Sequence, residues 1–208
     1  MLSPRRAVAL IALGAVCGTV PVYGAERVKA GRALVTFYWL IDESSSRYSK
    51  GKENAVLRDV HGNVIAKTRR QFKLDLVREG SGWLRDGRTV MFQKKVGGES
   101  RFRITSSKYG LSSNGCPLVP FRTIAVDPHF IKIGSRVYLP QLKGMVLPDG
   151  TVHDGMFIAA DRGHFSGKHL DFFIGVGTHG VRPFYRKGFG SRSRVTVYTE
   201  GTTHDCTP

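Results

Sequence analysis

Three aspartates stand out because of where they sit relative to apolar segments. Asp127 and Asp161 each follow a short apolar run, and Asp171 lies inside the apolar segment 170–174. Aspartate is common at strand ends as a turn former, which accounts for Asp127 and Asp161 without any function. It accounts poorly for Asp171, because an ionised carboxylate is costly to bury without partners. Clustered carboxylates raise one another's pKa, so one of them can stay protonated near neutral pH and act as a general acid.

Histidines gather in the second half of the chain and raise the question of a metal site. They are His129, His153, His164, His169 and His179. His164 and His169 could reach one ion together with Asp161, but no short His-x-x-x-His or Cys-x-x-Cys motif supports a zinc site. We therefore expect no metal and no other cofactor, and interpret these histidines as polar groove residues.

The first 24 residues have the pattern of a cleaved secretory signal. Arg5 and Arg6 precede the uncharged, mostly apolar run 7–20, and small or medium residues lie before Ala25, where a signal peptidase would cut. The run is too short for a comfortable membrane span, and no later segment of the chain is long enough. A lipoprotein reading would use Cys17, but the preceding residue is bulkier than that chemistry usually accepts. We predict a secreted or periplasmic protein associated with the cell envelope.

The chain of 208 residues has a net charge of +16, and removing residues 1–24 takes away two arginines and no acids, which leaves +14. An exported protein without an aromatic-basic nucleic-acid motif is not expected to bind nucleic acid. The charge suits anionic polymers of the envelope, or it is only a solvated basic surface. Two cysteines remain, Cys116 and Cys206, and an exported chain makes a disulfide between them a candidate. Geometry decides whether it forms. The oligomeric state is not predicted.

Short strands with turn signals between them dominate the pattern. The expected strands are 33–41, 64–68, 72–77, 89–93, 101–105, 124–126, 136–139, 157–160, 170–174 and 194–198. Residues 42–54 are expected to form a loop, and one short helical turn is expected within 177–185. The pattern predicts an all-β barrel or sandwich with little helix.

Three separated stretches resemble the three-aspartate (3D) domain, found in membrane-bound lytic transglycosylase A and related exported wall-remodelling proteins. They are Thr36-Phe37-Tyr38, then PLVPFRTIAVDPHFIKIGSRVYLP (117–140), then AADRGHFSGKHLDFFIGVG (159–177). The resemblance implies a six-stranded double-psi β-barrel. Residues 25–208 would form a single domain of this kind, with 42–116 as an inserted β-rich region or small β subdomain.

The resemblance also implies a function. Family members cut the bond between N-acetylmuramic acid and N-acetylglucosamine in peptidoglycan without water, which leaves anhydromuramoyl ends. Asp171 would then be the general acid/base, and Asp161 and Asp127 would orient it, hold its proton or stabilise positive charge on the sugar. The neighbouring Phe172 and Phe173 would help to raise the pKa of Asp171. The candidate substrate-binding residues are Thr36, Tyr38, Arg162, Gly163, His164 and Lys168.

The chain departs from the family pattern at Arg162, where a threonine usually stands between the aspartate and the glycine. If Arg162 points at Asp171, it lowers the pKa of that carboxyl and weakens the acid. If it faces the groove, its forked donor can bind lactyl or peptide carboxylates. Two alternatives therefore stand beside the transglycosylase: a barrel that binds peptidoglycan without cutting it, and a hydrolytic glycosidase in which Asp161 or Asp127 activates water.

Overall fold

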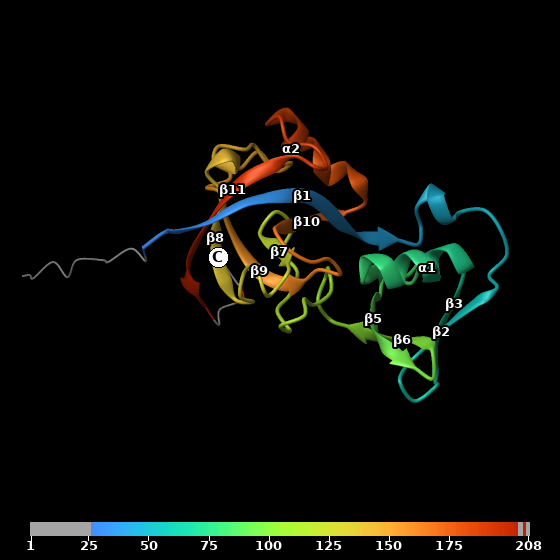
Figure 1. Ribbon diagram of the computed structural model, residues 1–208. Coiled ribbons are helices and arrows are strands. Elements are labelled where there is room, and N and C mark those ends of the chain that lie inside the picture. The colour runs from blue at the N-terminus through green and yellow to red at the C-terminus, as the bar shows by residue number, and fades with distance from the viewer. Residues whose placement is uncertain (1–25, 204–205, 207–208) are drawn as a thin grey trace, which may run out of the picture.

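One long strand, β1 (Val28–Asp42), runs through both parts of the molecule. The structure is a computed structural model that describes residues 26–203 and 206 (Figure 1). The first part of β1 pairs with strands of a barrel, and its last two residues, Ile41 and Asp42, pair with a strand of a second lobe. The expected strand 33–41 is therefore present and begins five residues earlier.

The barrel is closed by six strands. Besides β1 they are β7 (Thr123–Val126), β8 (Ser135–Tyr138), β9 (Met156–Arg162), β10 (His169–Val176) and β11 (Arg194–Thr202). Neighbouring strands follow the order β10, β7, β9, β8, β11 and β1, and β1 returns to β10. The pairs β1–β10 and β7–β9 are parallel, and the others are antiparallel. This confirms the predicted six-stranded barrel.

Alternation along the strands fills the barrel with apolar side chains. On β10, Leu170, Phe172 and Ile174 point into the main buried cluster, which also contains Phe157 of β9 and Val195 of β11. Because successive side chains of a strand face opposite sides, Asp171 lies on the other face. The barrel core thus determines which way the Asp171 carboxyl points.

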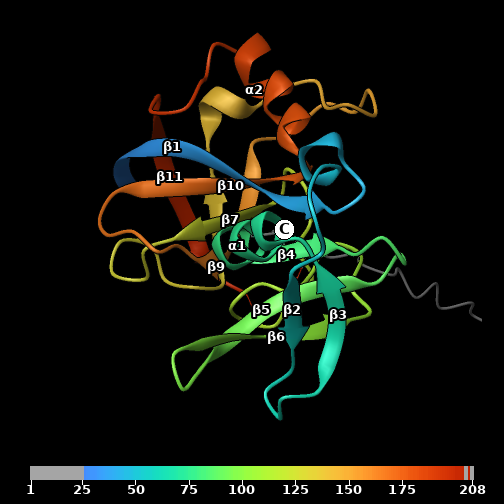
Figure 2. The same ribbon diagram turned by 90° about the vertical axis from the view of Figure 1, so that its right-hand side faces the viewer.

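The second lobe contains the remaining strands and the longer helix. It consists of η1 (Ser46–Tyr48), β2 (Ala55–Arg58), β3 (Val64–Thr68), α1 (Arg70–Glu79), β4 (Ser81–Trp83), β5 (Thr89–Val96) and β6 (Glu99–Thr105). Figure 2 shows β2 and β3 beside the β5–β6 hairpin, with α1 packed above them. The lobe has its own buried cluster, which includes Leu57, Phe72, Leu76 and Phe102.

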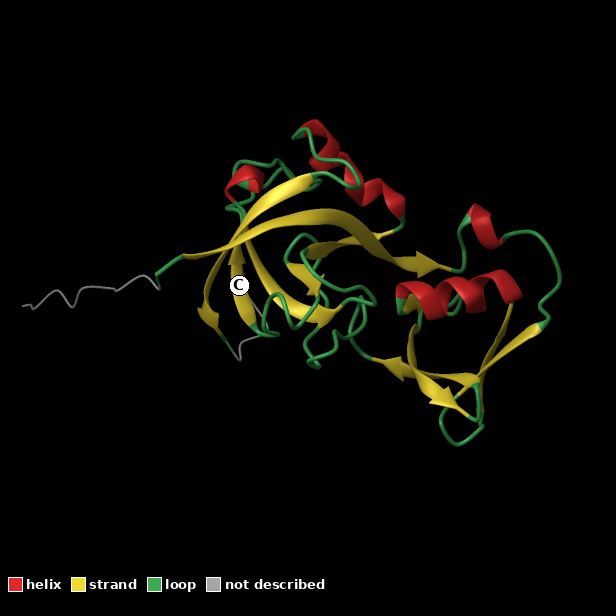
Figure 3. Ribbon diagram, viewed as in Figure 1, coloured by secondary structure: helices red, strands yellow, loops and turns green. Residues whose placement is uncertain are grey.

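The predicted strand 72–77 is wrong, because this segment belongs to helix α1 (red in Figure 3). Its buried side chains are Phe72, Asp75 and Leu76, a spacing of three and four residues that matches one face of a helix. Asp75 is buried because it accepts hydrogen bonds from Tyr48 at 2.9 Å and Arg47 at 2.8 Å. Asp75, which the predicted strand placed on its exposed side, therefore connects the helix to Arg47 and Tyr48.

The other helices are short. They are η2 (Pro140–Leu142), η3 (Thr178–Val181) and α2 (Arg182–Arg186). The last two confirm the helical turn expected within 177–185. None of the described helices is long and apolar enough to cross a membrane. The predicted signal segment 1–24 lies outside the described residues.

Cys116 and Cys206 form a disulfide with their Cα atoms 5.2 Å apart. The bond joins the end of the chain to the loop that precedes β7. Within this loop Ser112 donates hydrogen bonds to the Cys116 carbonyl from both its backbone N–H and its hydroxyl, each at 2.8 Å. The disulfide therefore holds a compact turn that extends to Ser113.

Candidate active site

Asp171 stands on β10 between two neighbouring strands. It lies opposite Thr36 of β1 and Ala125 of β7. Its carboxyl Oδ1 accepts a hydrogen bond of 2.7 Å from the Thr36 hydroxyl. Burial raises the pKa of Asp171 to about 6, the Thr36 hydrogen bond opposes this rise, and the charges of Glu79 and Asp161 add to it. The carboxyl can therefore be protonated or ionised close to neutral pH.

Asp161 lies at the end of β9 on the same side of the barrel. Its carboxylate accepts hydrogen bonds from the Tyr38 hydroxyl at 3.2 Å, the Ser113 N–H at 3.0 Å and the Arg162 N–H at 2.8 Å. These three donors hold the carboxylate in place. Burial raises the pKa of Tyr38 well above its usual value, and the charges of Asp161 and Asp171 add to the rise. Tyr38 is therefore a neutral donor to Asp161.

Asp127 has a different environment, at the end of β7. Its carboxylate accepts backbone hydrogen bonds from Gly167 at 2.6 Å and His129 at 2.9 Å. These two bonds, with that of Gly167 the larger, hold the pKa of Asp127 below its usual value. Asp127 is buried and is absent from the residues that line the cavity in front of Asp171. It fixes the end of the 163–168 turn.

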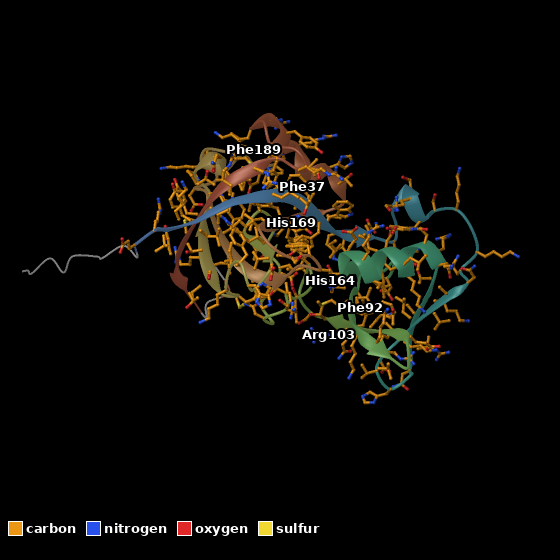
Figure 4. All side chains as sticks on the ribbon, viewed as in Figure 1. Phe37, Phe92, Arg103, His164, His169 and Phe189 are labelled. Carbon is orange, nitrogen blue, oxygen red and sulfur yellow. A yellow bond between two sulfur atoms is a disulfide. The ribbon has the colours of Figure 1, made fainter. Side chains whose placement is uncertain are left out.

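A cavity of about 560 Å³ lies in front of Asp171, between the barrel and the second lobe. Its barrel side includes Tyr38, Asp161, Arg162, Gly163, His164 and Asp171, and its lobe side includes Arg78, Glu79, Phe92 and Arg103. Figure 4 shows His164 at the barrel edge that faces the lobe, with Phe92 and Arg103 beyond it. The volume is in the range of small-ligand sites, and both charge signs line it.

Residues 122–183, which contain all three aspartates, match the family model of the 3D domain. This match spans 62 of the 208 residues. The barrel also has the fold of the Escherichia coli protein MltA solved with bound chitohexaose, at 13% identity and a TM-score of 0.59, over 83% of this chain and 72% of that one. MltA from Neisseria gonorrhoeae is similar at 12% identity and a TM-score of 0.53, over 85% and 75%. No curated protein matches the sequence. At these identities the likeness shows the fold alone, and it confirms the predicted double-psi barrel.

The predicted substrate-binding residues of the turn after Asp161 do not all lie at the cavity. Gly163 and His164 line the cavity, whereas Lys168 does not. The Lys168 side chain lies against Gly31 on β1, where an added Cβ would come within 3.2 Å of its Nζ. Thr36 reaches the site through its bond to Asp171.

Arg162 is exposed and lines the cavity. Its charge helps to lower the pKa of Asp127, after the two backbone hydrogen bonds. The causes of the shift at Asp171 are burial, Thr36, Glu79 and Asp161, and Arg162 is not among them. Of the two orientations considered for Arg162, the structure has the one that faces the groove.

The lobe side of the cavity contains functional candidates that sequence reasoning missed, namely Arg78, Glu79 and Arg103. Glu79 is the last residue of α1, its side chain is 8% exposed, and it pairs with Arg78 at 2.9 Å. Burial raises the pKa of Glu79, and the Arg78 hydrogen bond opposes the rise. A helical reading of residues 70–79 would have placed Glu79 at a helix end, but no sequence signal brings it to Asp171. Within residues 26–203 and 206, no group of three or more His, Cys, Asp or Glu side chains could hold a metal ion.

Proposed function

We propose that this protein is a peptidoglycan lytic transglycosylase that cleaves the bond between N-acetylmuramic acid and N-acetylglucosamine. The observation that carries the proposal is the Asp171 carboxyl, which faces a cavity and has its pKa raised to about 6. A 3D domain at residues 122–183 and the fold shared with MltA support the same class of enzyme.

Asp171 performs both proton transfers of the reaction. As a carboxylic acid it donates its proton to the glycosidic oxygen of the leaving N-acetylglucosamine. As a carboxylate it then takes the proton of the muramoyl C6 hydroxyl, whose oxygen closes on its own anomeric carbon and forms the anhydro ring. A group whose pKa lies near the working pH suits both steps, and no second nucleophilic carboxylate is required.

Asp161 and Asp127 support Asp171 in different ways. Asp161 is held by three donors on the cavity side, so its charge is positioned to keep Asp171 protonated and to stabilise positive charge on the sugar ring. Asp127 holds the turn through Gly167 and acts as a positioning residue. Asp161 and Asp127 therefore have unequal roles.

The glycan strand lies in the cleft between the barrel and the lobe. MltA of the same barrel fold was solved with bound chitohexaose, an observation on that protein that supports a glycan in this cleft. Arg78, Arg103 and Arg162 line it, and guanidinium groups bind carboxylates with paired hydrogen bonds. We assign them to the lactyl and peptide carboxylates of the muramoyl side. Residues 42–116 are then an inserted subdomain whose role is to supply the second wall.

The site of action is outside the cytoplasm. The signal-like residues 1–24, the basic charge that remains without them and the Cys116–Cys206 disulfide all suit an exported protein that meets the anionic cell wall. We propose a secreted or periplasmic location.

The test is to incubate the purified protein with peptidoglycan and to determine the mass of the released muropeptides. Anhydromuramoyl ends that disappear in Asp171→Asn, but persist in the control Asp149→Asn at an exposed turn, support the proposal. Reducing ends would identify a hydrolase in which Asp161 or Asp127 activates water. Binding of the protein to sedimented peptidoglycan without any soluble product would identify a binding module.

A further inference from the structure

One hydroxyl bridges an imidazole and the proposed catalytic carboxyl. His169 lies two residues before Asp171 on β10, so both side chains stand on the same face of the strand. Between them, on β1, Oγ1 of Thr36 lies 2.7 Å from Nε2 of His169 and 2.7 Å from Oδ1 of Asp171. The three groups form a continuous chain of hydrogen bonds.

We propose that Asp171, Thr36 and His169 form a proton relay in which His169 controls the protonation of Asp171 through the Thr36 hydroxyl. The inference rests on the proposed role of Asp171 as acid/base. It makes His169 a positioning residue, because its ring acts on the reacting atoms only through Thr36 and Asp171.

The relay has two directions, because a threonine hydroxyl has one proton to donate and lone pairs to accept another. In one direction Nε2–H of His169 donates to Thr36, and Thr36 donates to the Asp171 carboxylate. In the other, Oδ1–H of Asp171 donates to Thr36, and Thr36 donates to an unprotonated Nε2. Reversal moves one proton from Nε2 to Oγ1 and another from Oγ1 to Oδ1. An imidazolium and a carboxylate thereby become a neutral imidazole and a carboxylic acid, with no net gain of protons.

The surroundings move the pKa values of the two groups toward each other. Burial lowers the pKa of His169, and burial raises that of Asp171 to about 6. The ring of Phe165 covers His169, with the ring centroids 3.9 Å apart and the planes 26° from parallel. Gly163 leaves room for Phe165, since a Cβ at position 163 would lie 2.1 Å from that ring. Two groups that interact through such a hydrogen-bond chain titrate as a pair.

Other charges act on this pair through space. The titratable groups whose charges act on Asp171 are Glu79 on α1 and Asp161 on β9, and Tyr38 on β1 is affected by both Asp161 and Asp171. Arg78 on α1 pairs with Glu79. Within the described part of the chain, Thr36 is the only side chain that hydrogen-bonds to the Asp171 carboxyl or to the His169 ring. The relay is therefore the direct connection between the two groups.

The direction of the hydrogen bonds determines which oxygen of the Asp171 carboxyl carries the acidic proton. When neutral His169 carries its proton on Nε2, the hydrogen bonds run toward Asp171 and occupy Oδ1 as an acceptor. The acidic proton of Asp171 then sits on Oδ2, the oxygen that is free to face the sugar. When the ring carries its proton on Nδ1 alone, the proton of Asp171 is held at Oδ1 by Thr36.

The experiment is an NMR titration of the folded protein without glycan, in which the His169 ring and the Asp171 carboxyl carbon are followed against pH. In Asp171→Asn the midpoint of His169 should fall by about one pH unit, because imidazolium loses its carboxylate partner. In His169→Gln the midpoint of Asp171 should rise by the same amount, because coupling is reciprocal. Thr36→Val should abolish most of the coupling, and Thr36→Ser should keep it.

Two results would overturn the relay. Midpoints that stay in place in Asp171→Asn and His169→Gln would show that the groups are uncoupled. Full coupling in Thr36→Val would show that it acts through space. If Thr36→Val does not fold, ring nitrogen shifts of the wild type decide: a neutral His169 protonated only on Nδ1, across the range where Asp171 ionises, overturns the proposal, and an Nε2–H form supports it. Since no glycan is present, the outcome is independent of the muropeptide analysis.

Discussion

The two walls of the cleft are built differently. On the barrel wall Asp171 sits on a strand paired on both sides, and Asp161 is held by three hydrogen bonds. On the lobe wall Arg78 is 62% exposed at the end of α1, and Arg103 is exposed on β6. A reacting carboxyl must be placed to within a fraction of an ångström, whereas a charged substrate can be bound by long, mobile side chains. The barrel wall is suited to chemistry and the lobe wall to binding and tuning.

The largest effect is expected on the barrel wall. Asp171→Asn should lower the rate of anhydromuropeptide formation about a thousandfold, because a general acid contributes about 10²–10⁴-fold. The variant should still sediment with peptidoglycan, since the lobe wall is intact. Product analysis and a pelleting assay measure the two effects. A similar rate for variant and wild type would contradict the division between the walls.

The same variant makes a prediction about stability. The pKa of Asp171 is raised from 3.8 to about 6 in the folded protein, so the folded state keeps a proton that the unfolded state releases. Wild type should therefore lose about 2 to 3 kcal/mol of stability as the pH rises through this window. Asp171→Asn should lack this loss and be the more stable protein at pH 7. Denaturant unfolding at pH 4 and pH 7 measures the difference, and Glu99→Gln, at an acid that is 70% exposed, is the control.

The disulfide tests whether the barrel wall needs its anchored loop. Cys116 and Cys206 are 90 residues apart, and the Cys116→Ser, Cys206→Ser double variant should lower the free energy of unfolding by about 3 kcal/mol. Amide exchange should accelerate at Ser113, which donates to Asp161, more than in β2 and β3 of the lobe. Equal acceleration in both walls would show that the loop has no special link to the site.

Asp75 tests the integrity of the lobe wall. Tyr48, Arg47 and Gln71 all donate to its buried carboxylate, and although burial itself raises the pKa, these donors bring it below its usual value. Asp75→Asn should destabilise the protein by about 2 kcal/mol at pH 7, because those donors lose a charged acceptor. A lowered folded-state pKa means that the contribution is lost as the pH falls, so the variants should converge at low pH. Urea unfolding at pH 7 and pH 3 measures this, and Glu99→Gln, at an acid of the same lobe that is 70% exposed, is the control.

The smallest effect is expected from a charge on the lobe that shifts the pKa of Asp171. Glu79→Gln removes a charge that raises the pKa of Asp171, so the pH at which Asp171 ionises should fall by about half a unit. The pH dependence of the rate at low substrate concentration reports this pKa. Glu99→Gln, at an acid of the same lobe that is 70% exposed, should leave the profile in place. An unchanged profile in Glu79→Gln would mean that the lobe only binds.

Much of the barrel could be predicted from the sequence, because alternation is a local signal. Leu170, Phe172 and Ile174 point inward, so Asp171 points outward, and the motifs shared with the 3D domain implied the six-stranded double-psi barrel. At Asp127 the plain explanation, a turn former at a strand end, accounts for the bond from His129 but not for the bond from Gly167, which is 40 residues away.

The lobe wall could not be predicted in the same way. Helix α1 was missed because its buried polar residue, Asp75, depends on Arg47 and Tyr48, which are about thirty positions earlier in the chain. Glu79 reaches the cavity only because α1 ends beside β1, a tertiary contact with no local signature.

Strand β1 has a mechanical consequence. It crosses from the barrel to the lobe as one unbroken strand, paired with β10 on the barrel side and with β4 at its end. Its register with β10 shifts between Tyr38 and Leu40, directly before Ile41 and Asp42 pair with β4, and bending the strand there would break backbone hydrogen bonds to both partners. This pairing restrains the spacing of the two walls, so in the proposed function a glycan strand would enter a slot whose width changes little.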